Sequence, residues 1–375
     1  MGCKLPRVSA SMIVRNEEHF LDECLLSIVD EVDEIVIVDT GSTDRSIDIA
    51  RKYGAKIIER PWTGDFSAAR NIGLENATGD WILYIDADER LRVPAPGALR
   101  AAVSRPEAVA LFVSFRPRPD FTPYREPRLF RRDDRIRFRG VIHETTRPDI
   151  YSVCNSDAMI IEPVDIGIDH YGYEGDLTHK CVRNLPLLQD AVAKTPDRVF
   201  LWVDLAQALK GLGRLREAEA ACWEAIALAR GNPIAKQHCD GAKAWGCLIE
   251  LVLDGDLKRA VELADQAVAE YPDNHILALT RAGVHFDDGA ADTLLVPLQR
   301  LVAIDADVFA DPLISYDKRV FREWPNNLLG AVYARLGRRR EAGEAFARAA
   351  WYDPENIVYR AKASLFSSGP ANFGT

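Results

Sequence analysis

"GDWILYIDADERL", residues 79–91, runs from five apolar residues directly into a cluster of acids. The run Trp81–Ile85 has the length and composition of a buried strand. The acids Asp86, Asp88 and Glu89 follow at once, and negative charge beside a buried strand costs free energy unless a positive group balances it. The stretch therefore predicts a central strand that delivers carboxylates to a site where a cation binds.

The sequence around this stretch alternates between strand and helix patterns. The expected strands cover residues 7–14, 34–39, 55–60 and 80–88. The expected helices cover residues 17–32, 42–54 and 66–78. Such alternation predicts βαβ units and a mostly parallel sheet that is buried on both faces. Three further strand patterns, at 109–115, 127–132 and 136–144, predict a mixed or antiparallel edge.

From about residue 176 the strand patterns stop and an Ala- and Leu-rich helical pattern repeats. In residues 322–354, Leu329, Gly330, Tyr333, Ala342, Phe346, Ala349 and Pro354 have the spacing of a tetratricopeptide repeat. Similar copies follow Trp202 and Cys247, and a weaker one covers 275–306. We therefore predict four segments: a catalytic domain over 1–175, a linker helix over 176–198, helical repeats over 199–365, and a flexible tail over 366–375.

Composition narrows the class of protein. The chain has 375 residues, of which 47% are hydrophobic and 28% charged, and its net charge is -10. An acidic chain is a poor general binder of nucleic acid. No apolar run approaches the roughly 20 residues that span a bilayer, and the N-terminus does not resemble a secretory signal. Seven scattered cysteines without a Cys-x-x-Cys motif predict reduced thiols and a cytoplasmic protein.

The polar residues that follow the predicted strands indicate where chemistry takes place. Arg15 and Asn16 follow the first strand, Asp39 ends the second, and Asp86 and Asp88 end the fourth. In an open parallel sheet these ends meet at one crevice, where ligands bind. The Asp-x-Asp pattern suits Mg²⁺ or Mn²⁺, which take one or two carboxylates together with substrate phosphates. For Arg15 and Asn16, a donor-site role and a purely turn-shaping role both remain open.

Several motifs resemble a known family. "SMIVRNEE", "EIVIVDTGSTD", "FSAARNIGLENATGDWILYIDADE" and "RFRGVIHE" are similar, in this order, to the inverting family 2 glycosyltransferases of the GT-A fold. The likeness covers roughly residues 7–175. With its repeats, the chain also resembles the peptide S-glycosyltransferases that mature glycocins, and its catalytic half resembles lipopolysaccharide-core glucosyltransferases. The resemblance implies a nucleotide-sugar donor, commonly UDP-linked.

The resemblance also implies residue roles. Asp39 would contact the nucleobase, Arg70 would lie near the base or the diphosphate, and Asp86 would contact the ribose or the water shell of the metal. Asp88 would bind the metal in this Asp-x-Asp (DXD) motif. Glu89 would be a neighbour of the metal site rather than a ligand.

The last three expected roles belong to residues beyond this motif. Glu144 in "VIHE" would be the base that takes the acceptor proton, with His143 as the alternative base or an acceptor-positioning group. His170 would complete the metal shell or contact the diphosphate.

Three functions compete at this point. The leading one is transfer of a sugar to an acceptor that the repeats help to recognise, either a peptide or protein side chain or a saccharide, including a lipid-linked one. The second is a repeat scaffold with an inactive transferase half, and the intact Asp39, Asp86, Asp88 and Glu144 argue against it. The third is a nucleotidyltransferase, for which "SMIVRNEE" lacks the glycine-rich phosphate loop. Repeats that serve for homodimerisation would fit the sequence equally well.

Overall fold

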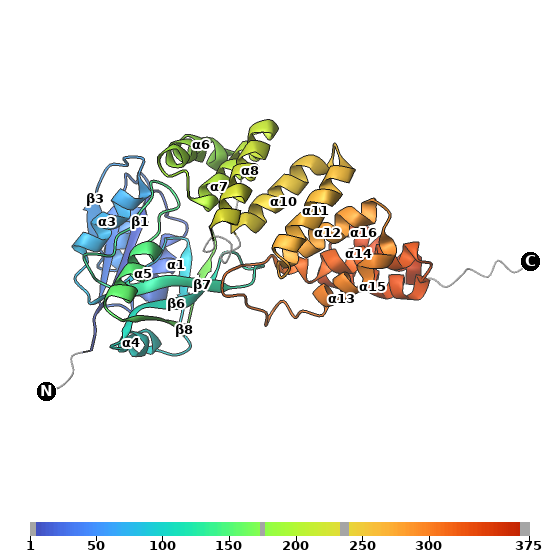
Figure 1. The fold of residues 1–375 in the computed structure, drawn as a ribbon. Coiled ribbons are helices and arrows are strands. Elements are labelled where there is room, and N and C mark those ends of the chain that lie inside the picture. The colour runs from blue at the N-terminus through green and yellow to red at the C-terminus, as the bar shows by residue number, and fades with distance from the viewer. Residues whose placement is uncertain (1–4, 173–176, 233–239, 368–375) are drawn as a thin grey trace, which may run out of the picture.

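One mixed sheet of eight strands organises the first half of the chain (Figure 1). The computed structural model describes residues 5–172, 177–232 and 240–367. The strands are β1 (Val8–Val14), β2 (Glu34–Asp39), β3 (Lys56–Glu59), β4 (Trp81–Tyr84), β5 (Glu89–Arg92), β6 (Ala108–Arg116), β7 (Tyr124–Arg131) and β8 (Ile160–His170). The helices of this half are α1 (Leu21–Ile28), α2 (Ser46–Lys52), α3 (Phe66–Asn76), α4 (Ala98–Val103) and α5 (Arg147–Ser156).

The strand order is β3-β2-β1-β4-β7-β6-β8-β5. The first four strands of the chain run parallel, and β7 joins β4 in the opposite direction. β4 therefore lies in the middle of the sheet, where Trp81, Ile82 and Leu83 are fully buried. Since β1, β2 and β4 are parallel, their carboxyl ends share one edge of the sheet, and the site is built at that edge.

Two hydrophobic layers cover the two faces of the sheet. One contains the buried side chains of α1, α2 and α4, among them Leu25 and Leu99. The other contains those of α3 and α5, among them Leu74 and Ile150. Coverage on both faces explains why β2 and β4 contain continuous apolar runs rather than an alternating pattern.

The predicted pattern is confirmed for the parallel strands and wrong at two places. The strand predicted over 80–88 ends at Tyr84, so Asp86 and Asp88 lie on the turn that precedes β5. The strand predicted over 136–144 does not form, because Gly140 and His143 take the left-handed backbone conformation, with φ of 106° and 53°. These residues belong instead to a loop, closed by an isolated bridge between Arg139 and Thr145.

The second half of the chain is helical, as the repeat pattern predicts. Its helices are α6 (Leu177–Lys194), α7 (Val199–Gly211), α8 (Leu215–Gly231), α10 (Asp240–Leu253), α11 (Leu257–Glu270), α12 (His275–Asp287), α13 (Leu295–Val302), α14 (Glu323–Arg335), α15 (Arg339–Tyr352) and α16 (Ile357–Ser367), with short 3-10 turns at Ala291–Leu294 and Lys318–Val320.

Small residues at the repeat positions let paired helices approach closely. Ala218, Ala260 and Ala342 are completely buried. At Gly330, an added Cβ would lie 2.7 Å from the ring of Phe346, so only glycine allows α14 and α15 this spacing. The expected linker helix corresponds to α6, and Leu188 of this helix shares the hydrophobic core of the repeats. The boundary near 175 and the tail beyond residue 367 lie outside the described residues.

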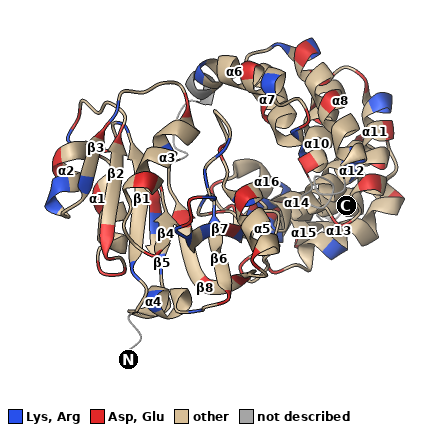
Figure 2. Ribbon diagram, turned by 60° about the vertical axis from the view of Figure 1, so that its left-hand side comes forward, with Lys and Arg blue, Asp and Glu red and all other residues tan. Residues whose placement is uncertain are grey.

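The helical half curves away from the sheet and returns toward it (Figure 2), and the described residues give contacts between the two halves at both of these approaches. At one, the loop 139–145 meets α7, and Ile142 enters the core of the helical half. At the other, the loop after β6 pairs with the segment before α14. There Thr122 donates its N–H to the carbonyl of Tyr316 at 2.8 Å, and the Tyr316 N–H returns a bond to Thr122 Oγ1 at 2.9 Å.

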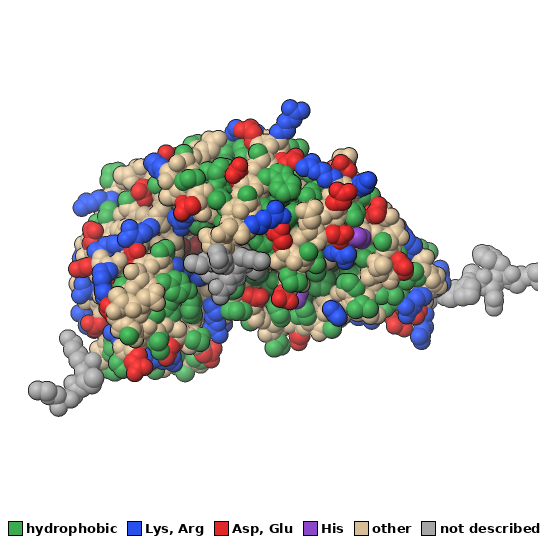
Figure 3. All heavy atoms as spheres, viewed as in Figure 1, with side chains coloured by type: hydrophobic (Ala, Val, Ile, Leu, Met, Phe, Trp, Pro, Cys, Tyr) green, Lys and Arg blue, Asp and Glu red, His purple; other side chains and the backbone are tan. Residues whose placement is uncertain are grey.

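On the face seen in Figure 3, acidic and basic side chains are intermixed. Within residues 5–172, 177–232 and 240–367, no helix is both long and apolar enough to cross a bilayer.

Candidate active site

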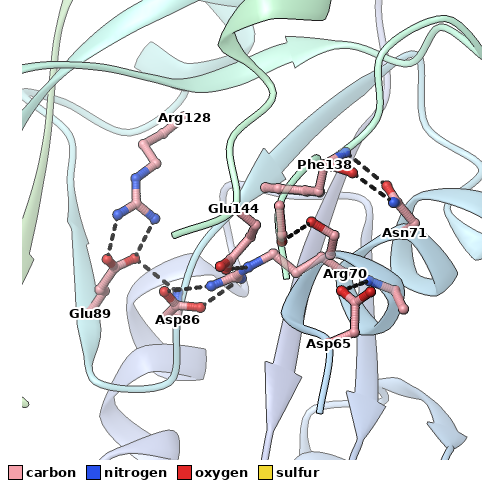
Figure 4. A network of polar contacts seen from close by, with 11 residues as sticks. Asp65, Arg70, Asn71, Asp86, Glu89, Arg128, Phe138 and Glu144 are labelled. Atoms are coloured by element: carbon pink, nitrogen blue, oxygen red, sulfur yellow. Dashed lines mark hydrogen bonds and ion pairs between the residues drawn. The ribbon is translucent and has the colours of Figure 1, made fainter. Parts of the chain in front are cut away.

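Two of the acids that follow β4, Asp86 and Glu89, are joined in a tight turn and paired with arginines (Figure 4). The carboxylate of Glu89 accepts the backbone N–H of Asp86 at 2.9 Å, and the Glu89 N–H donates to the Asp86 carbonyl at 3.0 Å. The same carboxylate forms a two-pronged ion pair with Arg128 of β7, with distances of 2.8 and 3.1 Å. The turn is thus closed by a buried charge pair that the sequence does not reveal.

Two aromatic rings and the Glu89 carboxylate surround the guanidinium of Arg128. Its guanidinium lies 4.2 Å from the ring centre of Tyr84 and 4.5 Å from that of Phe115. Burial lowers the pKa of Arg128, but the Glu89 carboxylate and the other acidic groups nearby together hold this pKa above its ordinary value. Glu89 is only 1% exposed. Glu89 therefore shapes the turn through Asp86 and Arg128, a role that the sequence did not indicate.

Arg70 of α3 links two of the predicted site residues. Its guanidinium binds Asp86 through two nitrogens, at 2.8 and 3.1 Å, and its Nε donates to Glu144 Oε1 at 2.5 Å. Burial raises the pKa of Asp86, but the charge and the hydrogen bond of Arg70, together with the charge of Arg128, hold this pKa below its ordinary value. Arg70 therefore keeps a donor-side carboxylate and the predicted base side by side.

Asp88 and His170, the two predicted metal ligands, lie together although 82 residues separate them. Asp88 Oδ2 lies 3.1 Å from His170 Nε2, and His170 Nδ1 lies 3.1 Å from the carbonyl of Pro117. Burial lowers the pKa of His170, but the hydrogen bond to Asp88 and the negative charges of Asp88 and Glu89 together hold this pKa above its ordinary value. A Cβ added to Gly172 would collide with the Asp88 carboxylate, so the chain passes close to these oxygens.

A carboxylate oxygen is a suitable ligand for Mn²⁺ or Mg²⁺, and an imidazole nitrogen favours a transition-metal ion such as Mn²⁺ over Mg²⁺. Among the described residues, no group of three or more His, Cys, Asp or Glu side chains is placed to hold a metal ion. A divalent ion at Asp88 and His170 would take its remaining ligands from substrate phosphates and water, as such sites commonly do. The residues present therefore fit a metal that arrives with its nucleotide.

The residues after β1 and β2 are engaged with one another. Asp39 is buried and accepts the N–H groups of Gly41 at 3.0 Å and Ser42 at 3.1 Å. Asn16 accepts the N–H of Thr43 at 2.7 Å, while Arg15 is exposed. Asn16 therefore links the loop after β1 to the loop after β2. This contact corresponds to the turn-shaping role, one of the two alternatives for Asn16. The structure gives Asp39 a turn-closing contact, and its contact with a nucleobase stays a prediction.

The side chain of His143 contacts the helical half of the chain. Its Nε2 lies 3.2 Å from Asp204 Oδ2 on α7, and its ring packs edge-on against Phe200. The alternative in which His143 acts as the base is therefore disfavoured, since its Nε2 is engaged by the helical half.

A cleft of about 550 Å³ opens beside His170, between the two halves of the chain. Arg118, Phe121 and Tyr171 line it from the sheet side, and Arg322, Glu323 and Tyr352 from the helical side. Because His170 lines the cleft and also contacts Asp88, the cleft leads to the predicted metal position.

Comparison with known proteins gives the same assignment as the motifs. Residues 9–160 match the family described as Glycosyl transferase family 2. A TPR repeat-containing protein of Synechococcus elongatus is 35% identical over 282 residues, which cover 72% of this chain and 68% of that protein. The SPbeta prophage-derived glycosyltransferase SunS of Bacillus subtilis is 31% identical over 209 residues, 51% of this chain and 46% of SunS.

Among solved structures, a mannosyltransferase from Pyrobaculum calidifontis in complex with GDP-Man and Mn²⁺ is 18% identical with a TM-score of 0.42, covering 67% of this chain and 88% of that one. With a family match over the sheet and a relative aligned along most of its length, the assignment is direct. The chain belongs to glycosyl transferase family 2, and it joins a GT-A transferase half to tetratricopeptide-like repeats.

Proposed function

We propose that this enzyme transfers a sugar, with inversion, from a nucleotide-diphosphate donor to an acceptor that enters between the two halves. UDP-sugars are the first donors to test. One observation carries the proposal: Asp86, Asp88, His170 and Glu144, which come from three distant segments, lie at one edge of the sheet and are linked through Arg70 or through each other.

In the proposed reaction, an acceptor O–H or S–H attacks the anomeric carbon from the face opposite the diphosphate. Glu144 takes the acceptor proton as the new bond forms. The bond between the anomeric carbon and the phosphate oxygen breaks, and the nucleoside diphosphate leaves with the electron pair. Asp88 and His170 would hold Mn²⁺ or Mg²⁺, which stabilises negative charge on the leaving group. Arg70 keeps the Glu144 carboxylate beside the reacting centre.

The cleft supports a polar polypeptide segment as the acceptor. Its walls carry both signs of charge, with Arg118 and Asp120 on one side and Arg322 and Glu323 on the other. An acceptor that relies on an anionic phosphate would favour a clearly basic wall, and a lipid would favour an apolar one. Repeat domains also commonly present extended surfaces to peptides.

Calorimetric titration with UDP, with and without Mn²⁺, tests the donor side of the proposal. The wild-type protein should bind UDP more tightly with Mn²⁺, and Asp88→Asn should weaken this binding by about 10-fold or more. Asp134→Asn is the matched control, because its side chain is 96% exposed in the same half of the chain. Equal UDP affinity with and without Mn²⁺ would contradict the metal assignment.

The acceptor class is tested by incubating the enzyme with UDP-glucose and Mn²⁺, together with either a mixture of short peptides or a mixture of oligosaccharides. Mass spectrometry then shows which mixture gains a hexose. Modification of the peptides supports the acceptor proposed here, and modification of the oligosaccharides alone would replace it with the saccharide alternative. UDP binding that depends on Mn²⁺ without any sugar release or transfer would favour the inactive scaffold.

A further inference from the structure

The loop that carries Glu144 is fixed at its base by the sheet half. Arg139 and Thr145 exchange two backbone hydrogen bonds of 3.1 Å, which close the loop. The start of α3 holds its first residues: the Phe66 N–H donates to the Val141 carbonyl at 3.0 Å, and Ser67 Oγ donates to the Gly140 carbonyl at 2.5 Å. These contacts leave the tip of the loop, Ile142 and His143, to be held by something else.

The helical half holds this tip. Ile142 is only 4% exposed and belongs to the hydrophobic cluster formed by α6, α7 and the helices that follow. His143 Nε2 lies 3.2 Å from Asp204 Oδ2 of α7, and the His143 ring packs edge-on against Phe200 at 6.1 Å between centres. Just before α7, Arg198 lies so close to Gly140 that an added Cβ would stand 3.0 Å from its Nη1.

The backbone of the tip is strained in a way that needs this support. His143 has a φ of 53°, in the left-handed region, where a residue with a Cβ pays about 1–3 kcal/mol. Such a conformation persists only where surrounding contacts fix it. Glu144 is the next residue, so the φ and ψ of His143 decide where the Glu144 carboxylate points. If the contacts to α7 were lost, His143 could relax and Glu144 would leave Arg70.

We propose that α7 is part of the catalytic apparatus, because it positions Glu144 through His143. Asp204 is then a positioning residue of the reaction, although it lies in the repeat half and does not reach the sugar. This proposal rests on the proposed function, in which Glu144 is the base. It means that the repeats do more than bind an acceptor, since α7 holds the loop tip next to Glu144 while Arg70 of the sheet half holds the carboxylate itself.

Asp204→Asn and Asp204→Ala in the full-length protein test the proposal. Slow hydrolysis of UDP-glucose in the presence of Mn²⁺, followed as UDP release, reports on the base without an identified acceptor, since water then loses its proton to Glu144. A base displaced by about 1 Å commonly costs up to about 100-fold in rate. We expect kcat to fall about 10-fold or more in Asp204→Ala and less in Asp204→Asn, which keeps a hydrogen-bond acceptor. Calorimetric affinity for UDP with Mn²⁺ should stay within about 3-fold, since Asp88 and His170 are untouched.

Glu250→Gln is the matched control, because it breaks an ion pair between α10 and Lys210 of α7 at a distance from the loop. It should leave kcat unchanged. Hydrogen exchange of the amides of residues 140–145 gives a second readout, and it should rise in both Asp204 variants but not in the control. Wild-type kcat and wild-type exchange in Asp204→Ala would overturn the proposal. A wild-type protein that neither binds UDP with Mn²⁺ nor releases it from UDP-glucose would instead refute the proposed function.

Discussion

Replacing Arg128 with methionine should destabilise the transferase half by about 3–5 kcal/mol, the usual cost of leaving one member of a buried ion pair alone. Arg128 donates two hydrogen bonds to Glu89. Glu89 is 1% exposed, so water cannot replace these donors, and the carboxylate would retain only the N–H of Asp86. Methionine keeps most of the aliphatic length of arginine, so packing changes little by comparison.

The double variant Glu89→Gln with Arg128→Met separates charge from packing. It removes both charges, and glutamine still offers an oxygen to the N–H of Asp86. Because neutral replacement of a buried pair is often nearly neutral in stability, the double variant should recover most of the loss, to within about 1–2 kcal/mol of the wild type.

Equilibrium urea unfolding followed by tryptophan fluorescence measures these differences, since Trp81 of β4 is fully buried in the same sheet. A loss of less than about 1 kcal/mol in the free energy of unfolding of Arg128→Met would show that the pair between Arg128 and Glu89 does not stabilise the turn. A double variant no more stable than the single one would show that the guanidinium acts through its contacts with Tyr84 and Phe115, rather than through charge.

Two further variants probe the site itself. Arg70→Lys should lower UDP-glucose turnover about 10-fold or more while leaving UDP affinity within about 3-fold, because a single ammonium cannot bind Asp86 through two nitrogens and reach Glu144 as well; unchanged turnover would mean that Glu144 does not need this link. Gly172→Ala should weaken Mn²⁺-dependent UDP binding by about 10-fold, because the new Cβ collides with the Asp88 carboxylate; calorimetry measures it, and unaltered affinity would argue against a metal at Asp88.

The sequence alone predicted the sheet and the repeats because both are written in short-range patterns. The strand Trp81–Tyr84 is apolar over its whole length and Glu34–Asp39 over its four central residues, which requires cover on both faces. The repeats return small residues at fixed spacing, which requires closely paired helices. The strand predicted over 136–144 was wrong. Its alternating composition is typical of a strand, but Gly140 and His143 have a left-handed backbone conformation. Their conformation depends on α3 and α7, which lie far away in the sequence.

The site residues also fall into two groups, those that the sequence indicated and those that only the structure revealed. The Asp-x-Asp pattern after an apolar strand predicted Asp86 and Asp88, and the family resemblance supplied Glu144 and His170 as further candidates. No local sequence pattern indicated that Arg128 would form an ion pair with Glu89.

For the same reason, no short-range pattern indicated that Asp204 of the repeat half would hold His143. These pairs join segments that are 39 and 61 residues apart, and they form only because sheet pairing and helix packing bring them together. The sequence therefore determined which carboxylates the strands deliver to the edge of the sheet. Only the tertiary structure decided which arginines and which helix hold these carboxylates in place. A buried charge is stabilised by the groups that surround it in space, and these come from distant parts of the sequence.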